Sequence, residues 1–215
     1  MFRRTRAGSE YSGQIDPISL VCVMARPKQF DRDVALKGAI EVFCDAGFEA
    51  ASTDDLLRRM RISRQSLYDT FGDKRALYLE ALRHYLAERV ATQIRILSAD
   101  ASATRGLEAA LNAFATDGPQ GRSPGCMGIG AVCEFGRSDP EIAGLIDSAE
   151  RPLIAAIRHR IEEGKSNGEI GAGVDPQAAA EFMTATFTGI KLAARGGASL
   201  QTLRNIAQMA IRSLK

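Results

Sequence analysis

The segment at residues 52–74, STDDLLRRMRISRQSLYDTFGDK, constrains this chain most, because it predicts two short helices joined by a tight turn. Ser52 followed three residues later by Asp55 has the spacing of a capping box, so a helix is expected to begin directly after Ser52. Ser63 can cap a second helix that ends near Phe71. Two helices joined by three or four residues form a helix-turn-helix, a unit whose second helix enters the major groove of DNA.

The second of these helices carries side chains that are suited to reading DNA. Arg64 and Gln65 lie on its first turn, where Arg is suited to bidentate contact with guanine and Gln with adenine. Hydroxyl and ammonium groups nearby are suited to phosphate oxygens, which position a protein on DNA without reading its sequence. The expected DNA-binding residues are Ser52, Arg64, Gln65, Ser66, Tyr68 and Lys74. The alternative is a basic helix face that only meets solvent, and the two flanking helix caps make this alternative the weaker one.

Residues 30–86 resemble the TetR family of transcriptional regulators. The most specific local mark is the LYDTF element at residues 67–71, followed by Lys74 at the start of a long helix. The resemblance implies that Ser52, Tyr68 and Lys74 contact the DNA backbone. It also implies a homodimer that binds a double-stranded operator and responds to a small-molecule effector.

The chain departs from the family's pattern at two places. Arg61 stands in the turn where the family usually has Gly, which costs roughly 1 kcal/mol if that residue is left-handed. Asp69 and Thr70 follow the tyrosine where the family often has His. Base preference therefore cannot be carried over from relatives.

Length and charge limit the other possibilities. The chain has 215 residues, of which 45% are hydrophobic, so it can build a substantial core. A net charge of +2 is too small for a general nucleic-acid coat, and the basic side chains must therefore act locally. No apolar run approaches the roughly 20 residues that span a bilayer, so a soluble, cytoplasmic protein without a membrane partner is expected.

The cysteines do not predict a metal site or a disulfide scaffold. Cys22, Cys44, Cys126 and Cys133 include no C-x-x-C pair, and the chain has only two histidines. Reduced thiols and the absence of a metal or other cofactor are therefore expected. Cys126 and Cys133 are two helical turns apart and could form a thiol sensor, but buried cysteine is more often a small apolar filler. The glycines of GCMGIG at residues 125–130 have the wrong order for a nucleotide-binding loop.

Almost every segment after Phe30 has a helical pattern, and no strand pattern of period two occurs, so the fold is expected to be all-α. Residues 1–23 lack this pattern and are expected to be a disordered extension, the alternatives being a misplaced start before Met24 or a basic arm that binds the minor groove. A helix-turn-helix DNA-binding domain is expected at residues 24–75, and a helical-bundle domain for ligand binding and dimerisation at residues 76–215. The expected helices are Arg32–Ala46, Ser52–Arg61, Arg64–Phe71, Asp73–Leu97, Thr104–Thr116, Cys126–Arg137, Pro140–Ser166, Pro176–Ala194 and Leu200–Leu214.

The helices at residues 140–166 and 176–194 are expected to form a four-helix interface with a second copy of the chain. The second of these has too little polar surface to pack on one side only. A helix buried only within its own subunit remains the alternative.

An effector cavity is expected between the helices at residues 104–116, 126–137 and 176–194. Glycines remove side-chain volume from one of its walls, and Met and Phe side chains stand opposite. The expected ligand is an uncharged or weakly acidic, partly hydrophobic molecule. The lining residues are expected to be Phe114, Met127, Cys133, Met183 and Phe187.

The sequence contains no G-x-S-x-G elbow, no H-E-x-x-H and no clustered acid pair suited to catalysis, so an enzyme is not expected. The preferred interpretation is a repressor that a small molecule releases from its operator, with activation left open. The alternative is a helical bundle that binds a small molecule or a protein and has no DNA function.

Overall fold

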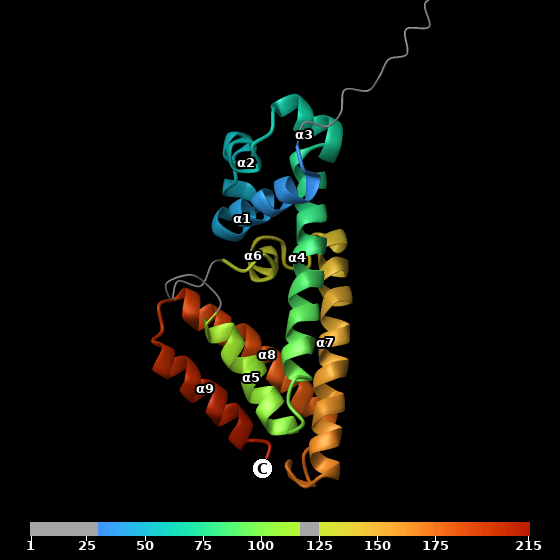
Figure 1. Ribbon diagram of the computed structural model, residues 1–215, viewed down its shortest axis with the longest axis vertical. Coiled ribbons are helices and arrows are strands. Elements are labelled where there is room, and N and C mark those ends of the chain that lie inside the picture. Colours follow the sequence, from blue (N-terminus) through green and yellow to red (C-terminus); the bar gives the residue numbers. More distant parts are fainter. Residues whose placement is uncertain (1–29, 117–124) are drawn as a thin grey trace, which may run out of the picture.

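A computed structural model of the chain describes residues 30–116 and 125–215, with only the backbone at 114–116, and these parts are all-helical (Figure 1). No strand occurs in these ranges, so the all-α prediction is confirmed. The extension expected at residues 1–23 lies outside the described residues. The helices are α1 (Arg32–Ala50), α2 (Thr53–Met60), α3 (Arg64–Phe71), α4 (Lys74–Leu97), α5 (Ala103–Thr116), α6 (Met127–Phe135), α7 (Pro140–Ser166), α8 (Pro176–Arg195) and α9 (Leu200–Arg212).

Side-chain caps set the beginnings of the first helices. Asp31, Ser52, Ser63 and Asp73 each accept a backbone N–H from the first turn of the helix that follows. Gly47 has φ 79°, ψ −172°, and it breaks α1 where the sequence predicts the helix to end. A few further helical residues follow this kink.

Two apolar cores divide the molecule. The first holds α1, α2, α3 and the beginning of α4 together, and we call these elements the head. Its largest fully buried side chains include Phe43, Leu56, Leu67 and Tyr78. The second core lies among the rest of α4, α5, α7, α8 and α9, which we call the body. The helix α4 belongs to both, so it joins the head to the body directly.

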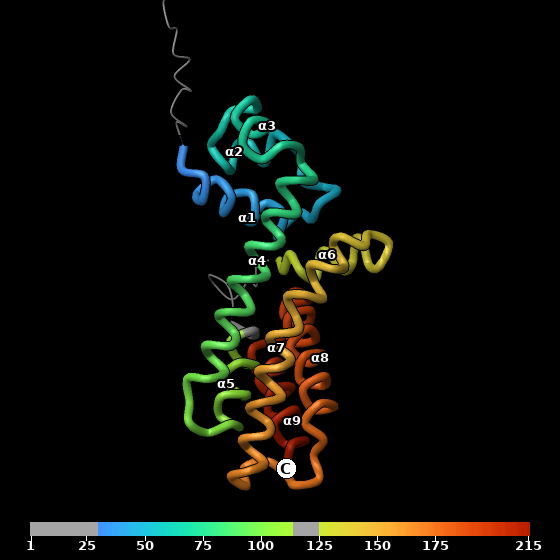
Figure 2. The backbone as a smooth tube through the Cα atoms, turned by 90° about the vertical axis from the view of Figure 1, so that its right-hand side faces the viewer, coloured from blue at the N-terminus to red at the C-terminus, as the bar shows by residue number. Residues whose placement is uncertain are grey.

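The short helix α6 lies where the head meets the body (Figure 2). It contacts both α1 and α7. Its buried residues, Met127 and Ala131, pack into the head core together with Ile142 and Ile146 from the first turns of α7. The body therefore reaches the head through α6 and α7 as well as through α4.

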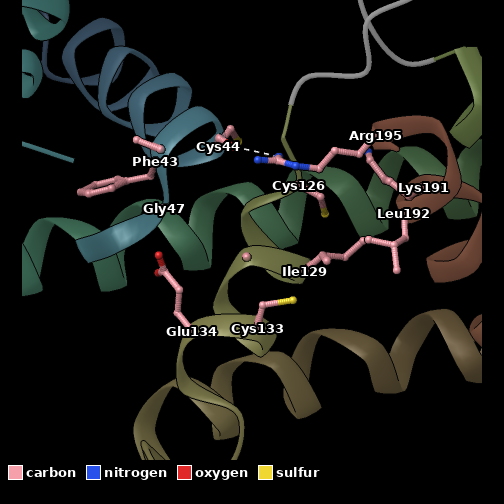
Figure 3. Close-up of a pocket in the computed structure, with 12 residues that line it drawn as sticks. Phe43, Cys44, Gly47, Cys126, Ile129, Cys133, Glu134, Lys191, Leu192 and Arg195 are labelled. Carbon is pink, nitrogen blue, oxygen red and sulfur yellow. Dashed lines mark hydrogen bonds between the residues drawn. The ribbon is translucent and has the colours of Figure 1, made fainter. Parts of the chain in front are cut away.

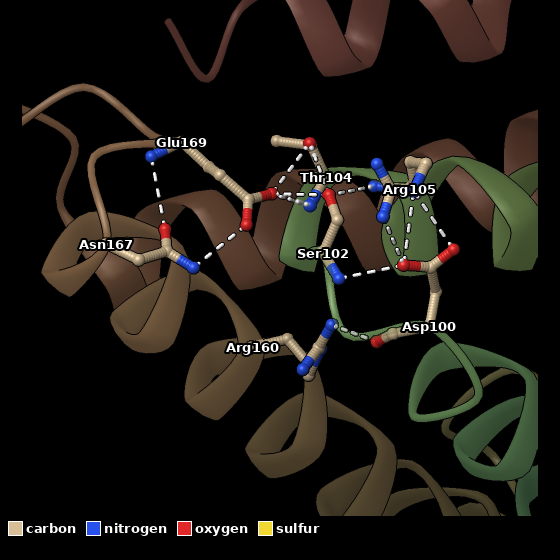
Figure 4. Close-up of polar contacts among 7 residues, drawn as sticks. All are labelled: Asp100, Ser102, Thr104, Arg105, Arg160, Asn167 and Glu169. Carbon is tan, nitrogen blue, oxygen red and sulfur yellow. Dashed lines mark hydrogen bonds and ion pairs between the residues drawn. The ribbon is translucent and has the colours of Figure 1, made fainter.

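A polar cluster at the far end of the body fixes the start of α5 (Figure 4). The Glu169 carboxylate accepts hydrogen bonds from Ser102 Oγ at 2.6 Å and from the Thr104 N–H at 3.1 Å. These bonds, that of Ser102 first, lower the pKa of Glu169 to about 2. Close by, Arg160 Nη2 donates to the Asp100 carbonyl at 2.8 Å. The α7–α8 loop is thus tied to the α4–α5 corner.

Candidate nucleic-acid interface and ligand cavity

The turn between α2 and α3 has the geometry of a helix-turn-helix. Arg61 ends α2 with φ 56°, ψ 42°, a left-handed conformation that is unusual outside glycine. Its backbone N–H donates to the Leu57 carbonyl and closes the helix. The sequence predicts a cost of roughly 1 kcal/mol if Arg61 is left-handed. The structure shows that Arg61 does adopt this conformation.

The N-terminal side chains of α3 are exposed, but they are held by acidic neighbours. Arg64 Nη2 lies 2.9 Å from Asp54 Oδ1 of α2. Gln65 Nε2 donates to Asp69 Oδ1 at 2.8 Å, one turn further along α3. Tyr68 is half-exposed, on the same helix. These contacts orient the two expected base-reading side chains without burying them.

The other expected DNA-contacting residues lie around the same end of the head. Ser52 Oγ donates to Asp55 Oδ2 at 2.6 Å, and this bond is the main cause of the lowered pKa of Asp55. Ser66 Oγ lies 2.9 Å from Ser63 Oγ at the start of α3. The Lys74 ammonium lies 4.6 Å from the centre of the Phe48 ring, which fixes its position at the beginning of α4.

Sequence reasoning missed the contacts that join the head to the body. Both Glu134 carboxylate oxygens accept the backbone N–H of Phe48, at 2.8 and 3.1 Å. Arg75, near the start of α4, pairs with Asp139 at 2.7 Å, and this bond lowers the pKa of the Asp139 carboxyl. Asp139 could be recognised as a cap because Pro140 follows it, but no local pattern indicates a partner 64 residues away.

Two glycines allow the segment around α6 to approach α1 closely. A Cβ at Gly125 would lie 1.5 Å from the Cys44 carbonyl oxygen, so only glycine fits there. A Cβ at Gly47 would lie 2.1 Å from a Glu134 carboxylate oxygen. α6 therefore contacts α1 near both of its ends.

A cavity of about 240 Å³ lies between α1, α6 and α8 (Figure 3). All three cysteines in the described part of the chain line it: Cys44, Cys126 and Cys133. Figure 3 also shows Arg195 reaching from α8 to the Cys44 carbonyl, to which its Nη1 donates at 3.4 Å. The cavity thus lies at the junction of head and body.

A second cavity, of about 180 Å³, lies within the body among α4, α6, α7 and α8. Its walls are largely apolar, with Leu86, Val90, Ile129 and Phe187 among the lining residues. Gln93 also lines it, at 3% exposure, and its Oε1 has no hydrogen-bond partner among the described residues. Cys126 and Lys191 line both cavities.

Four residues of the expected pocket have described side chains, and the structure does not place these four around one cavity. Met127 packs into the head core, and Met183 into the body core. Cys133 lines the cavity beside α1, whereas Phe187 lines the cavity inside the body. The side chain of Phe114 lies outside the described parts. An apolar residue on a short helix can face either of two cores, and the sequence pattern alone does not say which core receives it.

One apolar face of α8 is exposed in the single chain. Phe182 and Leu192 are 48% and 56% exposed on α8, and Ala185 and Gly189 are exposed between them. Phe187, on the same helix, instead points into the body, with 3% exposure. The exposed residues therefore form one apolar face of this helix.

The described ranges contain neither a membrane-spanning helix nor a cluster of metal ligands. No helix there is both long and apolar enough to cross a membrane. The same residues include no group of three or more His, Cys, Asp or Glu placed to hold a metal ion.

A helix-turn-helix head joined to a helical body is the architecture of a class of DNA-binding proteins. Comparison with known proteins identifies the family. The family model for bacterial regulatory proteins of the tetR family matches residues 35–81, and that for a tetracyclin repressor-like C-terminal domain matches residues 103–210. The chain belongs to the TetR family and is a DNA-binding transcriptional regulator.

Individual relatives cover nearly the same length. The uncharacterized HTH-type transcriptional regulator YezE of Bacillus subtilis is 33% identical over 85% of this chain and 95% of its own. The HTH-type transcriptional repressor ComR of Escherichia coli is 29% identical over 87% and 90%. The TetR family regulator CifR, solved as a cysteine mutant with a 26-base-pair double-stranded operator, is 28% identical over 88% of this chain and 100% of its own, with a TM-score of 0.77.

Proposed function

We propose that the chain is a homodimeric repressor that reads its operator with α3 and leaves it when a small molecule binds the body. The observation that carries this proposal is the exposed end of α3, where Arg64 and Gln65 stand free of the core and are held only by surface acids. CifR, which binds operator DNA, and the repressor ComR support it.

Within the head, the roles divide by chemistry. Arg64 and Gln65 are proposed to contact base edges, because a fork of N–H donors suits guanine and an amide suits adenine. Ser52, Ser66, Tyr68 and Lys74 are proposed to contact phosphates or sugars. The domain division follows from this: residues 24–75 form the DNA-binding unit, and residues 76–215 form the unit for ligand binding and dimerisation.

Two copies are needed because a helix-turn-helix protein binds half-sites one helical turn apart, about 34–36 Å. Helix α7 and the apolar face of α8, with Phe182 and Leu192 exposed, are proposed to pack against the same elements of a second chain. This arrangement would place the two α3 helices in successive major grooves.

A ligand can release the operator only to the extent that it binds the released state more tightly than the DNA-bound state. The two cavities beside α6 suit this role because α6 contacts α1 of the head. A molecule that enters either cavity would change how α6 meets the head.

The test is selection of double-stranded DNA from a random pool, followed by titration of the selected sequence at several salt concentrations. We expect a site with two-fold symmetry, bound by a dimer at least about 10³-fold more tightly than unrelated DNA. Equal affinity for all double-stranded sequences, or none at all, would support instead a helical-bundle module without a DNA function.

A further inference from the structure

The exposed side of α3 carries an acid beside the side chains that are proposed to meet DNA. Arg64, Gln65, Tyr68 and Asp69 are all exposed, and they form two pairs spaced by four residues, which places them on neighbouring strips of one helix face. The opposite side of the helix packs into the head core. A carboxylate repels phosphate, so Asp69 on this face needs a role other than contact with the DNA backbone.

Asp69 fixes which way round the Gln65 amide lies. Gln65 Nε2 donates to Asp69 Oδ1 at 2.8 Å. A carboxylate can only accept hydrogen bonds, so the nitrogen of the amide must face Asp69 and the oxygen must point away from it. The reversed amide would lose this bond and set its Oε1 against a negative charge. Water can relieve that conflict on the free protein, whereas a DNA groove excludes much of the water and makes the conflict more costly.

The orientation of this amide decides which purine it can match. In the major groove adenine presents the N7 acceptor and the N6 amino donor, whereas guanine presents two acceptors, N7 and O6. An amide of fixed orientation offers one N–H and one carbonyl oxygen in a set order, which matches adenine. Against guanine, the same amide would bring its oxygen up to O6. An amide that is free to turn can direct its N–H groups to guanine instead.

We propose that Asp69 is a positioning residue for sequence reading: it holds the Gln65 amide in the orientation that accepts adenine and rejects guanine. The proposal rests on the reading of the operator by α3 proposed above. Asp69 acts through Gln65 and makes no base contact of its own. Its charge lowers the affinity for DNA of every sequence, and in return one base pair of the operator is read more strictly.

The experiment first locates the base pair that Gln65 reads. Sites selected by the full chain are varied one base pair at a time, and fluorescence anisotropy gives the Kd of each site for the wild type and for Gln65→Ala. We expect one position in each half-site at which the wild type prefers adenine to guanine by at least about fivefold, the lower end of the discrimination by a bidentate contact. Gln65→Ala should lose this preference.

Asp69→Asn then tests the orientation of the amide. An asparagine at this spacing can pair with glutamine, as Asn205 does with Gln201 on α9 at 2.9 Å. Its amide can donate as well as accept, so either orientation of Gln65 keeps a bond. We expect the preference for adenine over guanine to fall to about twofold or less at the Gln65 position. Binding to all sequences should become tighter, because a negative charge is removed.

Two further variants separate orientation from charge. Asp69→Glu should restore the preference, because a glutamate accepts from a glutamine at the same spacing on α8, where Gln177 Nε2 lies 2.8 Å from Glu181 Oε1. Asp54→Asn removes an equal charge beside Arg64 and is the matched control. It should leave the preference at the Gln65 position unchanged.

The double variant Gln65→Ala/Asp69→Asn shows the route by which Asp69 acts, and it should distinguish adenine from guanine no differently from Gln65→Ala. A further change in the double variant would mean that Asp69 meets the base directly, which overturns the proposal. An unchanged preference in Asp69→Asn also overturns it, as does a selected operator without adenine at the Gln65 position, and both of these results leave operator binding intact. Equal affinity of the wild type for all sequences would contradict the proposed function and this role of Asp69 together.

Discussion

Asp54 Oδ1 accepts a hydrogen bond from Arg64 Nη2 at 2.9 Å, so an acid of the first helix of the helix-turn-helix holds the leading side chain of the second. Both side chains are more than half exposed, and exposed pairs of this kind contribute only about 0.2–1 kcal/mol. Arg64 can therefore exchange this partner for DNA at little cost.

Removing the acid should strengthen DNA binding. We expect Asp54→Asn to raise operator affinity by up to about fivefold, because it frees Arg64 and removes a charge that repels phosphate. Arg64→Ala should instead weaken operator binding by about 1–3 kcal/mol and relax the sequence preference at one base pair. Titration against the operator and against single-base variants measures both effects. If Arg64→Ala bound the operator as well as the wild type does, Arg64 would not be a base-reading residue.

Substitutions of Lys74 and Gln65 should affect DNA binding in different ways. Lys74→Ala is expected to weaken binding to all DNA about equally, because its ammonium is proposed to contact phosphate. It should also reduce the salt slope by roughly one unit for each phosphate that is no longer neutralised. Gln65→Ala should change sequence preference and leave the slope unchanged. Affinities at four or five salt concentrations distinguish the two. A change of sequence preference in Lys74→Ala would assign that residue to base reading.

Two glycines at α6 should respond oppositely to alanine. Gly125→Ala places a Cβ 1.5 Å from the Cys44 carbonyl and should destabilise the protein by about 1–3 kcal/mol, as overpacking does. Gly130→Ala, within α6 and with nothing within 4 Å of the new atom, should stabilise by up to about 1 kcal/mol. Urea unfolding of both variants measures this difference. Similar midpoints for the two would mean that α6 does not press on α1 in solution.

The dimer face gives a further prediction. Ala185→Glu adds a charge between the exposed Phe182 and Leu192 and should yield monomers, since an unpaired charge is costly to bury in an interface. Gln201→Glu, exposed on α9, adds the same charge away from this face and is the control. Light scattering reports the mass of each. An intact dimer in Ala185→Glu would place the interface elsewhere. Phe187, on the same helix, is unsuitable for this test because it faces inward.

Acid should loosen the far end of the body. The pKa of Glu169 is about 2 in the folded state, below the usual 4.5, so its contribution to stability is full above about pH 5 and is lost as pH falls toward 2. Glu169→Gln should flatten the dependence of unfolding free energy on pH in this window. Thermal unfolding between about pH 3 and pH 7 gives the comparison. An unchanged slope would show that Ser102 and Thr104 do not hold this carboxylate in solution.

Local rules explain why much of the fold was predictable. Caps at Ser52 and Ser63, the helix end at Gly47 and the bounds of α7 follow from residues that are neighbours in the sequence. The contacts of Glu134 with Phe48 and of Arg75 with Asp139 join residues 86 and 64 positions apart, which local patterns do not encode. Met127 shows the same limit: its burial was predictable, but the core that receives it was not.

The helix α4 begins beside α3 and ends inside the body core, and its 24 residues make it about 36 Å long. A tilt of about 5° around its body end would move its head end by about 3 Å, close to the rise of one base pair of DNA, about 3.4 Å. Two subunits tilting in opposite directions double that displacement. Small changes of packing beside α6 are therefore large enough, by leverage alone, to take the paired recognition helices out of register with the operator.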